Sequence, residues 1–297
     1  MKLVSILLEG QRLAGLLEGD DVYVTSVPGL DVAIAAGIRV KDEPGQWRKL
    51  SSVQLDVPLR PGSILCTGNN YKDHLEERKP GAHATNAAPR ELEFFLKAGQ
   101  TIASLNEPLR LDPSIGNKID QETELGLVMG PGCPRRVPEK LALNYVFGYL
   151  VVNDLSARDK QVRLMKDGSN FMVLGASKNF DGSTRLSQYV TTADEIDDVY
   201  NLELRTYVNG ALRQKNSTSR LVNSLSEVVS FFSQGLSLQP GGIISTGTPG
   251  GTGWGQDQAL GGNGHVPAEC TPARYLRPGD EVRSVVGKVG ELTFRVE

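Results

Sequence analysis

Short runs of strand-forming residues, broken by Gly, Pro, Asn and Asp, follow one another along most of the 297-residue chain. Several short strands separated by turn residues are typical of β-rich folds. Helical patterns do not alternate with these runs, so the chain does not predict a doubly wound parallel sheet. We therefore predict an α+β fold that is mostly β, with strands within 63–68, 124–130, 145–154, 201–210, 241–247, 280–286 and 291–296.

The N-terminal part of the chain has a pattern of its own. Strand-like runs at 2–8, 12–19 and 21–27 predict a small β-meander, and a short helix is expected at 31–38. Two prolines then precede the next strand, at Pro58 and Pro61. We therefore predict a small β-rich domain over residues 1–59 and a larger domain over residues 60–297.

One helix has clear signals at both ends. Ser224 and Glu227 have the spacing of a capping box, apolar residues follow at helical spacing, and Gly235 ends the pattern. Two stretches rich in Gly, Pro and Ala, 78–90 and 249–274, are instead expected to be long loops. Loops of that length are commonly lids or disordered segments.

Composition argues against several classes of protein. The formal net charge of −3 gives no basic field for a nucleic acid. No apolar run reaches membrane-spanning length, and the N-terminal apolar stretch is too short for a secretory signal. The three cysteines have no CxxC spacing, which favours a reduced, cytoplasmic setting without a disulfide framework.

Three carboxylates lie at the ends of apolar runs. Glu122 and Glu124, in QETELGLVMG, are two residues apart, so on a strand both side chains point the same way. Asp154 ends the apolar run YLVVND. Alone, the glutamate pair is more typical of a solvated strand face, and Asp154 of a turn or a helix cap. Together they offer three hard oxygen ligands, which suit Mg²⁺, Mn²⁺ or Ca²⁺ better than Zn²⁺ because no His or Cys accompanies them.

A histidine and a glutamate form a second candidate group. His74 and Glu77 are three residues apart, so on one helical turn they share a face. A carboxylate beside an imidazole fixes its tautomer, which is the arrangement of a general base that acts on water. The other histidines, His83 and His265, lie in Gly- and Ala-rich stretches and are expected to be solvated.

Eight segments within residues 60–295 occur in the order and at the spacings of one protein family. They are CTGNNYKDHLEE, ELEFFLKAGQTI, IDQETELGLVMG, VFGYLVVNDLSARDKQ, SKNFDG, VNGALRQKNST, GGIISTGTPGG and YLRPGDEV. Through them the chain resembles the fumarylacetoacetate hydrolase family. Residues 1–58 have a weaker resemblance to the small N-terminal domain of longer bacterial members.

The resemblance implies mixed β-sheets rolled around a central cavity, and a homodimer. It implies Mg²⁺ or Mn²⁺ held by three carboxylates, here Glu122, Glu124 and Asp154, and a His–Glu pair that activates water, here His74 and Glu77. It further implies a catalytic role for one lysine and substrate contacts for five residues: Lys178 for catalysis, and Lys97, Arg158, Gln161, Gly247 and Thr248 for the substrate, with Lys97 near the rim of the site.

The resemblance leads to three hypotheses about function. The first is a metal-dependent hydrolase that cleaves a carbon–carbon bond of a 2,4-dioxo acid of the acylpyruvate type, giving pyruvate and a second acid, in the catabolism of sugar acids or aromatic compounds. The second is a decarboxylase of an oxaloacetate-like acid, or a keto–enol or double-bond isomerase, on the same site. The third is a non-catalytic protein that binds a metal or a small acid.

The chain departs from the family pattern in two places. NFDGSTRLSQYV replaces the usual sequence after the family lysine, and a long segment follows STGTP before the last strands. Both departures concern loops that could touch the distal part of a substrate, so they leave substrate identity open.

Overall fold

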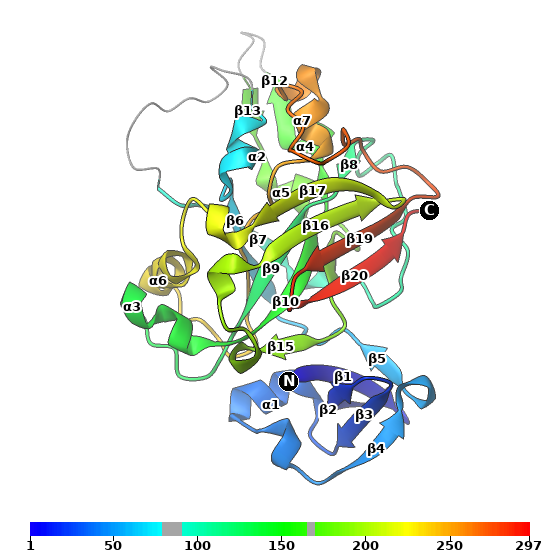
Figure 1. The fold of residues 1–297 in the computed structure, drawn as a ribbon, viewed down its shortest axis with the longest axis vertical. Helices are drawn as coiled ribbons and strands as arrows, with labels where there is room; N and C mark the ends of the chain where they lie inside the picture. The colour runs from blue at the N-terminus through cyan, green and yellow to red at the C-terminus, as the bar shows by residue number, and fades with distance from the viewer. Residues whose placement is uncertain (79–90, 165–169) are drawn as a thin grey trace.

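The computed structural model describes residues 1–78, 91–164 and 170–297, and in this part of the chain strands predominate over helices. The largest sheet has twelve strands (Figure 1). Its main path runs, in spatial order, through β4 (Gly45–Lys49), β3 (Asp21–Thr25), β2 (Gln11–Glu18), β1 (Lys2–Leu8), β15 (Val190–Thr192), β10 (Val146–Asp154), β9 (Thr123–Met129), β18 (Ile243–Ser245), β6 (Ser63–Gly68) and β7 (Glu93–Ala98), with β14 (Thr184–Leu186) beside β10 and β5 (Gln54–Asp56) beside β1.

A second sheet covers the middle of the first. It consists of β17 (Ala211–Ser217), β16 (Glu203–Val208), β19 (Glu281–Val286) and β20 (Gly290–Arg295). Two short pairs complete the strands, β8 (Ile119–Asp120) with β11 (Ser156–Ala157) and β12 (Val162–Leu164) with β13 (Asn170–Met172). The α-helices are short: α1 (Gly29–Ala36), α2 (Lys72–Glu76), α3 (Glu139–Ala142), α4 (Arg158–Gln161), α5 (Leu174–Lys178), α6 (Leu225–Gly235) and α7 (Gly253–Gln256).

Strand β9 lies at the centre of the core, and all its residues are buried. It pairs antiparallel with β10 on one side and with β18 on the other. A strand that is covered on both faces reads as a nearly continuous apolar run rather than an alternating one. Leu125, Leu127 and Met129 accordingly belong to one hydrophobic cluster and Val128 to another. This packing fixes β9 firmly, together with the glutamates at its start.

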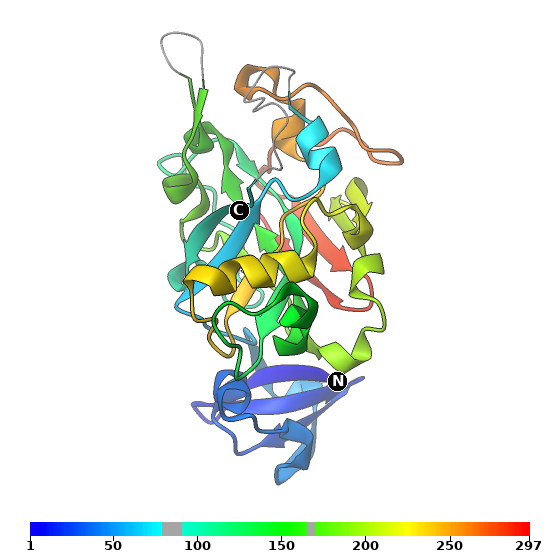
Figure 2. The same ribbon diagram turned by 90° about the vertical axis from the view of Figure 1, so that its left-hand side faces the viewer.

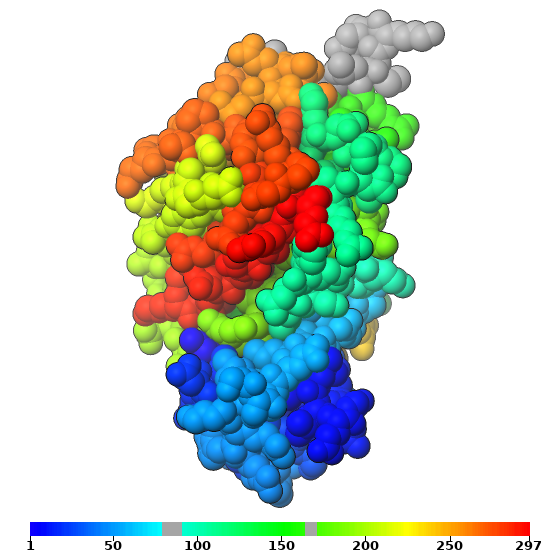
Figure 3. Space-filling model, turned by 90° about the vertical axis from the view of Figure 1, so that its right-hand side faces the viewer, coloured from blue at the N-terminus to red at the C-terminus, as the bar shows by residue number. Residues whose placement is uncertain are grey.

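The N-terminal strands continue the large sheet. Strand β1 pairs with β2 on one side and with β15, from the middle of the chain, on the other. One core cluster includes Leu3 and Leu30 together with Ile64, Val128 and Leu150. The first 59 residues nevertheless lie together at one end of the molecule (Figure 3). The division into domains 1–59 and 60–297 stays a prediction.

Local signals predicted several elements well. Helix α6 begins after Ser224 and ends at Gly235, and both hydrogen bonds of the predicted capping box are present. Its Phe232 packs against Phe94 of β7. Figure 2 shows the helix lying across the strands behind it. The segment 249–274, expected as a loop, contains α7. Residues 79–90, most of the other expected loop, lie outside the described residues, as does His83. Among the helices described, none has the length and apolar character needed to cross a membrane.

Candidate active site

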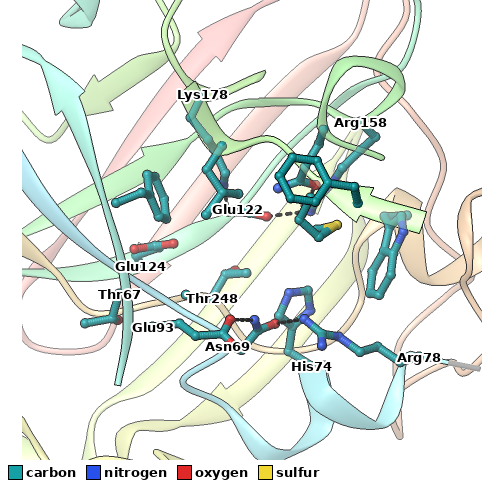
Figure 4. A pocket seen from close by; sticks show the side chains of 17 residues that line it. Thr67, Asn69, His74, Arg78, Glu93, Glu122, Glu124, Arg158, Lys178 and Thr248 are labelled. Atoms are coloured by element: carbon teal, nitrogen blue, oxygen red, sulfur yellow. Dashed lines mark hydrogen bonds and ion pairs between the residues drawn. The ribbon is translucent and has the colours of Figure 1, made fainter. Parts of the chain in front are cut away.

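A cavity of about 390 Å³ opens at the end of the molecule that lies away from the N-terminal strands. Its walls come from β6, α2, β7, β9, α4, β13 and α5 and from the segment after β18 (Figure 4). Most of the candidate residues line it: His74, Glu122, Glu124, Arg158, Gln161, Lys178 and Thr248. Segments from five distant parts of the chain therefore meet at one site.

Three candidate metal ligands lie close together beside this cavity, and two of them, Glu122 and Glu124, line it. In the described part of the chain, Glu122, Glu124 and Asp154 are the acidic group whose ligand atoms lie within 4.8 Å of one another, and all three residues are buried. The antiparallel pairing of β9 with β10 brings them together, because Val152 pairs with Glu124 and the Asp154 N–H donates to the Glu122 carbonyl at 2.9 Å. The donor set is entirely carboxylate oxygen, which fits a divalent cation such as Mg²⁺ or Mn²⁺.

Two cationic side chains offset part of this negative charge. The Lys178 ammonium donates to Glu122 Oε2 at 2.5 Å and to Asp154 Oδ2 at 2.6 Å. Arg158 donates through one Nη to Glu122 Oε1 at 2.5 Å. Burial opposes ionisation of Glu122, but these two cations hold the pKa of its carboxyl well below its usual range. Glu122 is therefore a carboxylate before any metal binds.

Glu124 lacks such a cation. Its Oε2 accepts from Ser245 Oγ at 2.5 Å and from the Gly247 N–H at 2.9 Å, and both donors are neutral. Burial, followed by the charges of Asp154 and Glu122, raises the pKa of the Glu124 carboxyl to about 8. The repulsion expected from the Glu-x-Glu spacing is thus present in the fold. A divalent cation would remove it by replacing a proton with a stronger positive charge.

The predicted pair of His74 and Glu77 is formed. Helix α2 carries His74, Glu77 follows its last turn, and His74 Nδ1 lies 2.6 Å from Glu77 Oε2. Both residues are buried, Glu77 completely. A carboxylate oxygen only accepts, so Nδ1 carries the proton and Nε2 is left free to accept. Because His74 lines the cavity, this geometry suits a base acting on a molecule held there.

Arg158 connects the candidate metal ligand Glu122 to two further polar residues. Besides Glu122, it donates to Asp120 Oδ2 at 2.9 Å and to Gln161 Oε1 at 2.8 Å. Helix α4, a single turn, brings Arg158 and Gln161 to the same side. Burial lowers the pKa of the guanidinium, but Glu122 and Asp120 outweigh this and raise it above its usual value. The two acidic partners of Arg158 are thus Asp120 and Glu122.

Lys97 lies in a different place from the one expected. It is completely buried, and its ammonium donates to Asp154 Oδ1 at 2.5 Å and to the Ser183 carbonyl at 3.0 Å. It therefore lies behind Asp154 and not at the rim of the cavity. The reason is strand alternation, which turns Phe95 and Lys97 of β7 inward while Phe94 and Leu96 face outward.

The segment after β18 supplies two further predicted residues. Gly247 has a φ of 90° and donates its N–H to Glu124, and an ideal Cβ there would lie 3.0 Å from Cβ of Asn70. Thr248 lines the cavity, but its hydroxyl donates to the Thr123 carbonyl at 3.0 Å and accepts from Gln214 Nε2 at 2.9 Å. Thr248 therefore shapes the wall, and its hydroxyl proton is already used.

Sequence reasoning missed several residues that complete the site. Asp120 alternates with Glu122 and Glu124, and this period of two was a usable signal. Ser245, which donates to Glu124, and Trp254, whose ring meets that of His74 edge-on at 5.9 Å, had no such signal. His265 lies in a separate hollow with Asp73 and Glu269.

Comparisons with known proteins agree with this arrangement. The family model for the C-terminal part of fumarylacetoacetate (FAA) hydrolase matches residues 63–297. An uncharacterized protein of Staphylococcus aureus (strain USA300) is 31% identical over 233 residues, which cover 78% of this chain and 68% of the relative.

Several solved structures match the whole chain, among them two named for activities relevant to the site. A 5-carboxymethyl-2-hydroxymuconate delta-isomerase from Mycobacterium smegmatis has a TM-score of 0.72 and 28% identity, covering 100% of this chain and 98% of its own. A maleylpyruvate hydrolase from Sphingobium sp. SYK-6, in complex with manganese(II) and pyruvate, has a TM-score of 0.73 and 25% identity over the same shares. The family match over most of the chain, its curated relative and its fold all lead to one conclusion: the chain belongs to the fumarylacetoacetate hydrolase family.

Proposed function

We propose that the protein is a divalent-metal-dependent hydrolase that cleaves a carbon–carbon bond of a 2,4-dioxo acid, giving pyruvate and a second acid. The observation that carries this proposal is that one cavity is lined by Glu122 and Glu124 of a buried carboxylate triad and by His74 of an ordered His–Glu pair. The neighbouring hydrolase structure that contains manganese(II) and pyruvate supports the same reading. Catabolism of aromatic compounds or sugar acids is the setting that such substrates suggest.

Mg²⁺ or Mn²⁺ would be held by Glu122, Glu124 and Asp154. When bound, a cation at this position supplies Lewis acidity toward the 2-oxo acid end of the substrate. Ca²⁺ has the same preference for carboxylate oxygen and would also fit these ligands. Because the three side chains are buried, their attraction to a bound cation would be screened less than at the protein surface.

The residues of the chain account for the remaining chemistry. His74 Nε2 takes a proton from a water molecule, whose oxygen then forms a bond to the C4 carbonyl carbon. The C3–C4 bond breaks, its electron pair stays on C3 as the enolate of pyruvate, and the proton on His74 returns to C3. Glu77 holds the imidazole that gains and loses this proton. The Lys178 ammonium stabilises the negative charge that develops on the enolate oxygen.

We infer the substrate contacts from the predicted residues that line the cavity. Arg158 and Gln161 offer polar groups to it, and Thr248 forms part of its wall. Gly247 holds Glu124, and we propose that its close backbone approach also shapes the carboxylate end of the pocket. Lys97 acts through Asp154, since its ammonium is bonded there. The contribution of Lys97 to substrate binding is thus an indirect one.

The alternative is an isomerase or decarboxylase on the same site. The relative named as a delta-isomerase favours it, because that protein has the same fold and 28% identity. These reactions share the need to stabilise an enolate, but they do not need an attacking water. The non-catalytic hypothesis is disfavoured by the presence of His74, Glu77 and Lys178 around one cavity.

A product screen tests the proposal. The protein is incubated with Mg²⁺ or Mn²⁺ and with acylpyruvates, sugar-derived 2,4-dioxo acids, oxaloacetate and ring-opened aromatic acids, and products are identified by mass spectrometry. Pyruvate plus a second acid supports the hydrolase. Release of CO₂ from oxaloacetate alone, or a product of unchanged mass, would replace it with the decarboxylase or the isomerase.

Metal binding is expected to release a proton. In the ligand-free protein the pKa of Glu124 is about 8, so at pH 7 this carboxyl keeps its proton, which a metal must displace. Affinity should therefore rise with pH up to about 8 and then level off. Isothermal titration with Mg²⁺ at pH 7, in two buffers of different ionisation enthalpy, measures the proton directly. Identical heats in the two buffers would contradict this expectation.

We also propose that the enzyme is a homodimer. Strand β7 ends the large sheet and exposes two apolar side chains, Phe94 (50%) and Leu96 (49%). Apolar side chains on an edge strand are a liability for a monomer and favour pairing. The enzyme is proposed to work in the cytoplasm, which agrees with its three free cysteines.

Leu96→Lys is expected to weaken the dimer, because it would place a charge in an apolar contact. Light scattering after size exclusion should show a shift from dimer toward monomer at micromolar concentration. Val32→Lys, on α1 and 44% exposed, is the matched control and should leave the mass unchanged. A monomeric parent protein would end this part of the proposal.

A further inference from the structure

The segment that departs most from the family pattern packs directly on the His–Glu pair. After β18 the chain passes over Glu77, forms α7 and returns past the end of α2 at Asn263. Figure 1 shows α7 beside α2 at the top of the molecule. Long loops next to a site are commonly flexible covers, but this one is fastened by hydrogen bonds to the pair itself.

In the described part of the chain the Glu77 carboxylate receives four hydrogen bonds, and three of them come from this segment. Its Oε1 accepts from the N–H groups of Gly251 and Thr252 at 2.7 and 3.0 Å. Its Oε2 accepts from Thr252 Oγ1 at 2.9 Å and lies 2.6 Å from His74 Nδ1. Both carboxylate oxygens are thus held, and among the described residues the Thr252 hydroxyl is the one side-chain donor to Glu77 besides His74.

The direction of the Thr252 hydroxyl is set by a further contact. Thr252 is completely buried, and its Oγ1 also accepts from the Gly255 N–H at 3.1 Å, as the cap of α7. Because the oxygen accepts from Gly255, its own proton is directed to Glu77. One hydroxyl group, that of Thr252, therefore both caps α7 and orients the Glu77 carboxylate.

The far side of the segment is anchored near the carboxylate triad. Asp120 accepts from the N–H groups of Gly253 and Trp254 at 2.8 and 3.0 Å, and it also accepts from Arg158. The Trp254 ring meets His74 edge-on, and its indole N–H donates to the Leu260 carbonyl at 3.0 Å. The segment thus connects the candidate base to the strand that leads into Glu122.

A second attachment holds the end of α2. The Asn263 N–H donates to the Glu77 carbonyl at 2.9 Å, and its side-chain amide donates to the carbonyls of Glu76 and Arg78. These carbonyls follow the last turn of a short helix and would otherwise need water. The backbone around Glu77 is therefore fixed independently of its side chain.

Close approach explains the glycines of the segment. An ideal Cβ at Gly255 would lie 2.3 Å from Glu77 Oε1, and one at Gly251, where φ is 101°, would lie 2.0 Å from the Arg213 carbonyl oxygen. Neither position has room for a side chain. Glycine at both positions is what allows the backbone to reach the carboxylate.

We infer that Thr252 is a positioning residue, whose hydroxyl holds Glu77 in the orientation that keeps the proton of His74 on Nδ1 and leaves Nε2 free toward the cavity. This inference rests on the proposed function in so far as His74 is the base. Without the hydroxyl, Glu77 Oε2 retains His74 as its donor among the described residues, while Oε1 stays bonded to the N–H groups of Gly251 and Thr252. The second oxygen is then held less firmly, so the imidazole is less firmly fixed in its orientation and tautomer, while the cavity that binds the substrate keeps its lining.

Thr252→Val tests the inference, because valine has nearly the shape of threonine without the hydroxyl. We expect kcat for acylpyruvate cleavage to fall about 10–100-fold, the range typical when a group that orients a reacting side chain is removed, with KM almost unchanged. Thr252→Ser, which keeps the hydroxyl, should retain most of kcat. Thr271→Val is the matched control: Thr271 lies in the same segment and donates to the Leu212 carbonyl, far from Glu77 in its contacts.

A measurement without turnover separates this inference from the proposed function. In ¹⁵N-histidine-labelled enzyme with Mg²⁺, the two ring nitrogens of His74, assigned with His74→Ala, report the tautomer. We expect the Nδ1–H form in the parent and in Thr252→Ser, and a mixture of forms in Thr252→Val. Thr252→Ala serves the same comparison if the valine variant does not fold.

Three results would overturn the inference. They are an unchanged tautomer in Thr252→Val, an unchanged kcat in an active enzyme, or a loss in Thr252→Ser as large as that in Thr252→Val, which would mean that the methyl group and packing matter. A parent protein that cleaves no acylpyruvate would instead refute the proposed function, and the tautomer measurement would still decide the role of Thr252.

Discussion

Glu124→Gln is expected to abolish C–C hydrolysis and to weaken Mg²⁺ and Mn²⁺ binding by far more than the roughly 10–100-fold that follows loss of an outer contact. The amide keeps the size of the side chain and can still accept from Ser245 and Gly247, so the fold should persist. What is lost is one of three anionic ligands. Two carboxylates that are already paired with Lys178 leave the ion short of charge and of oxygen donors.

Calorimetric titration with Mn²⁺ measures this effect, and hydrolysis is assayed on the same samples. Glu122→Ala and Asp154→Ala should give the same loss, and chelation should remove the activity of the parent. Glu291→Gln, a change on the surface strand β20, is the control and should behave as the parent. Unchanged affinity in all three ligand variants would refute the assignment of the metal site.

His74→Ala is expected to lower C–C hydrolysis by about 10²–10⁴-fold, the usual contribution of a general base. The candidate metal ligands lie at the start of β9, directly before it and at the end of β10, and not on α2, so Mg²⁺ and a 2-oxo acid should still bind. Decarboxylation of oxaloacetate needs no attacking water and should fall much less. The measurement is therefore one variant in two assays, and the ratio of the two losses is the informative quantity.

Two comparisons make this prediction specific. Glu77→Gln should reduce hydrolysis in the same direction as His74→Ala, because the amide no longer provides two equivalent acceptors. His265→Ala, in a different hollow, should have no effect. Equal losses in both assays would mean that His74 also transfers protons to the enolate. Full hydrolysis in His74→Ala would refute the base assignment.

The sequence predicted those helices and strands that local patterns determine. The helix 225–235 follows from Ser224, Glu227 and Gly235, which act within one or two turns. The buried strand β9 could be predicted because its apolar run is a local pattern that does not depend on any other element. Polar strand β17, ALRQKNS, was missed because its side chains are half-buried, and its place is set by pairing with β16. The strand conformation of β17 is stabilised by pairing within the sheet and is not indicated by its own composition.

The site residues also divide into those that a local pattern indicates and those whose position depends on the fold. Glu122 and Glu124 could be grouped by their spacing, but their distance to Asp154 depends on the pairing of β9 with β10. The position of Lys97 depended on which face of β7 is inside, and the run EFFLKAG has apolar residues on both faces. Thr252 lies 175 residues from Glu77, so no local pattern could reveal their contact.

The tight passage of Gly251 and Gly255 over Glu77 also limits where this enzyme can be diversified. Side chains cannot be introduced at these two positions without moving the Arg213 backbone or the carboxylate itself. Phe171 of β13 also lines the cavity and is 61% exposed, so its side chain can be exchanged with little disturbance of the core. A library that seeks a new substrate range is therefore best built at this position, with Gly251 and Gly255 left unchanged.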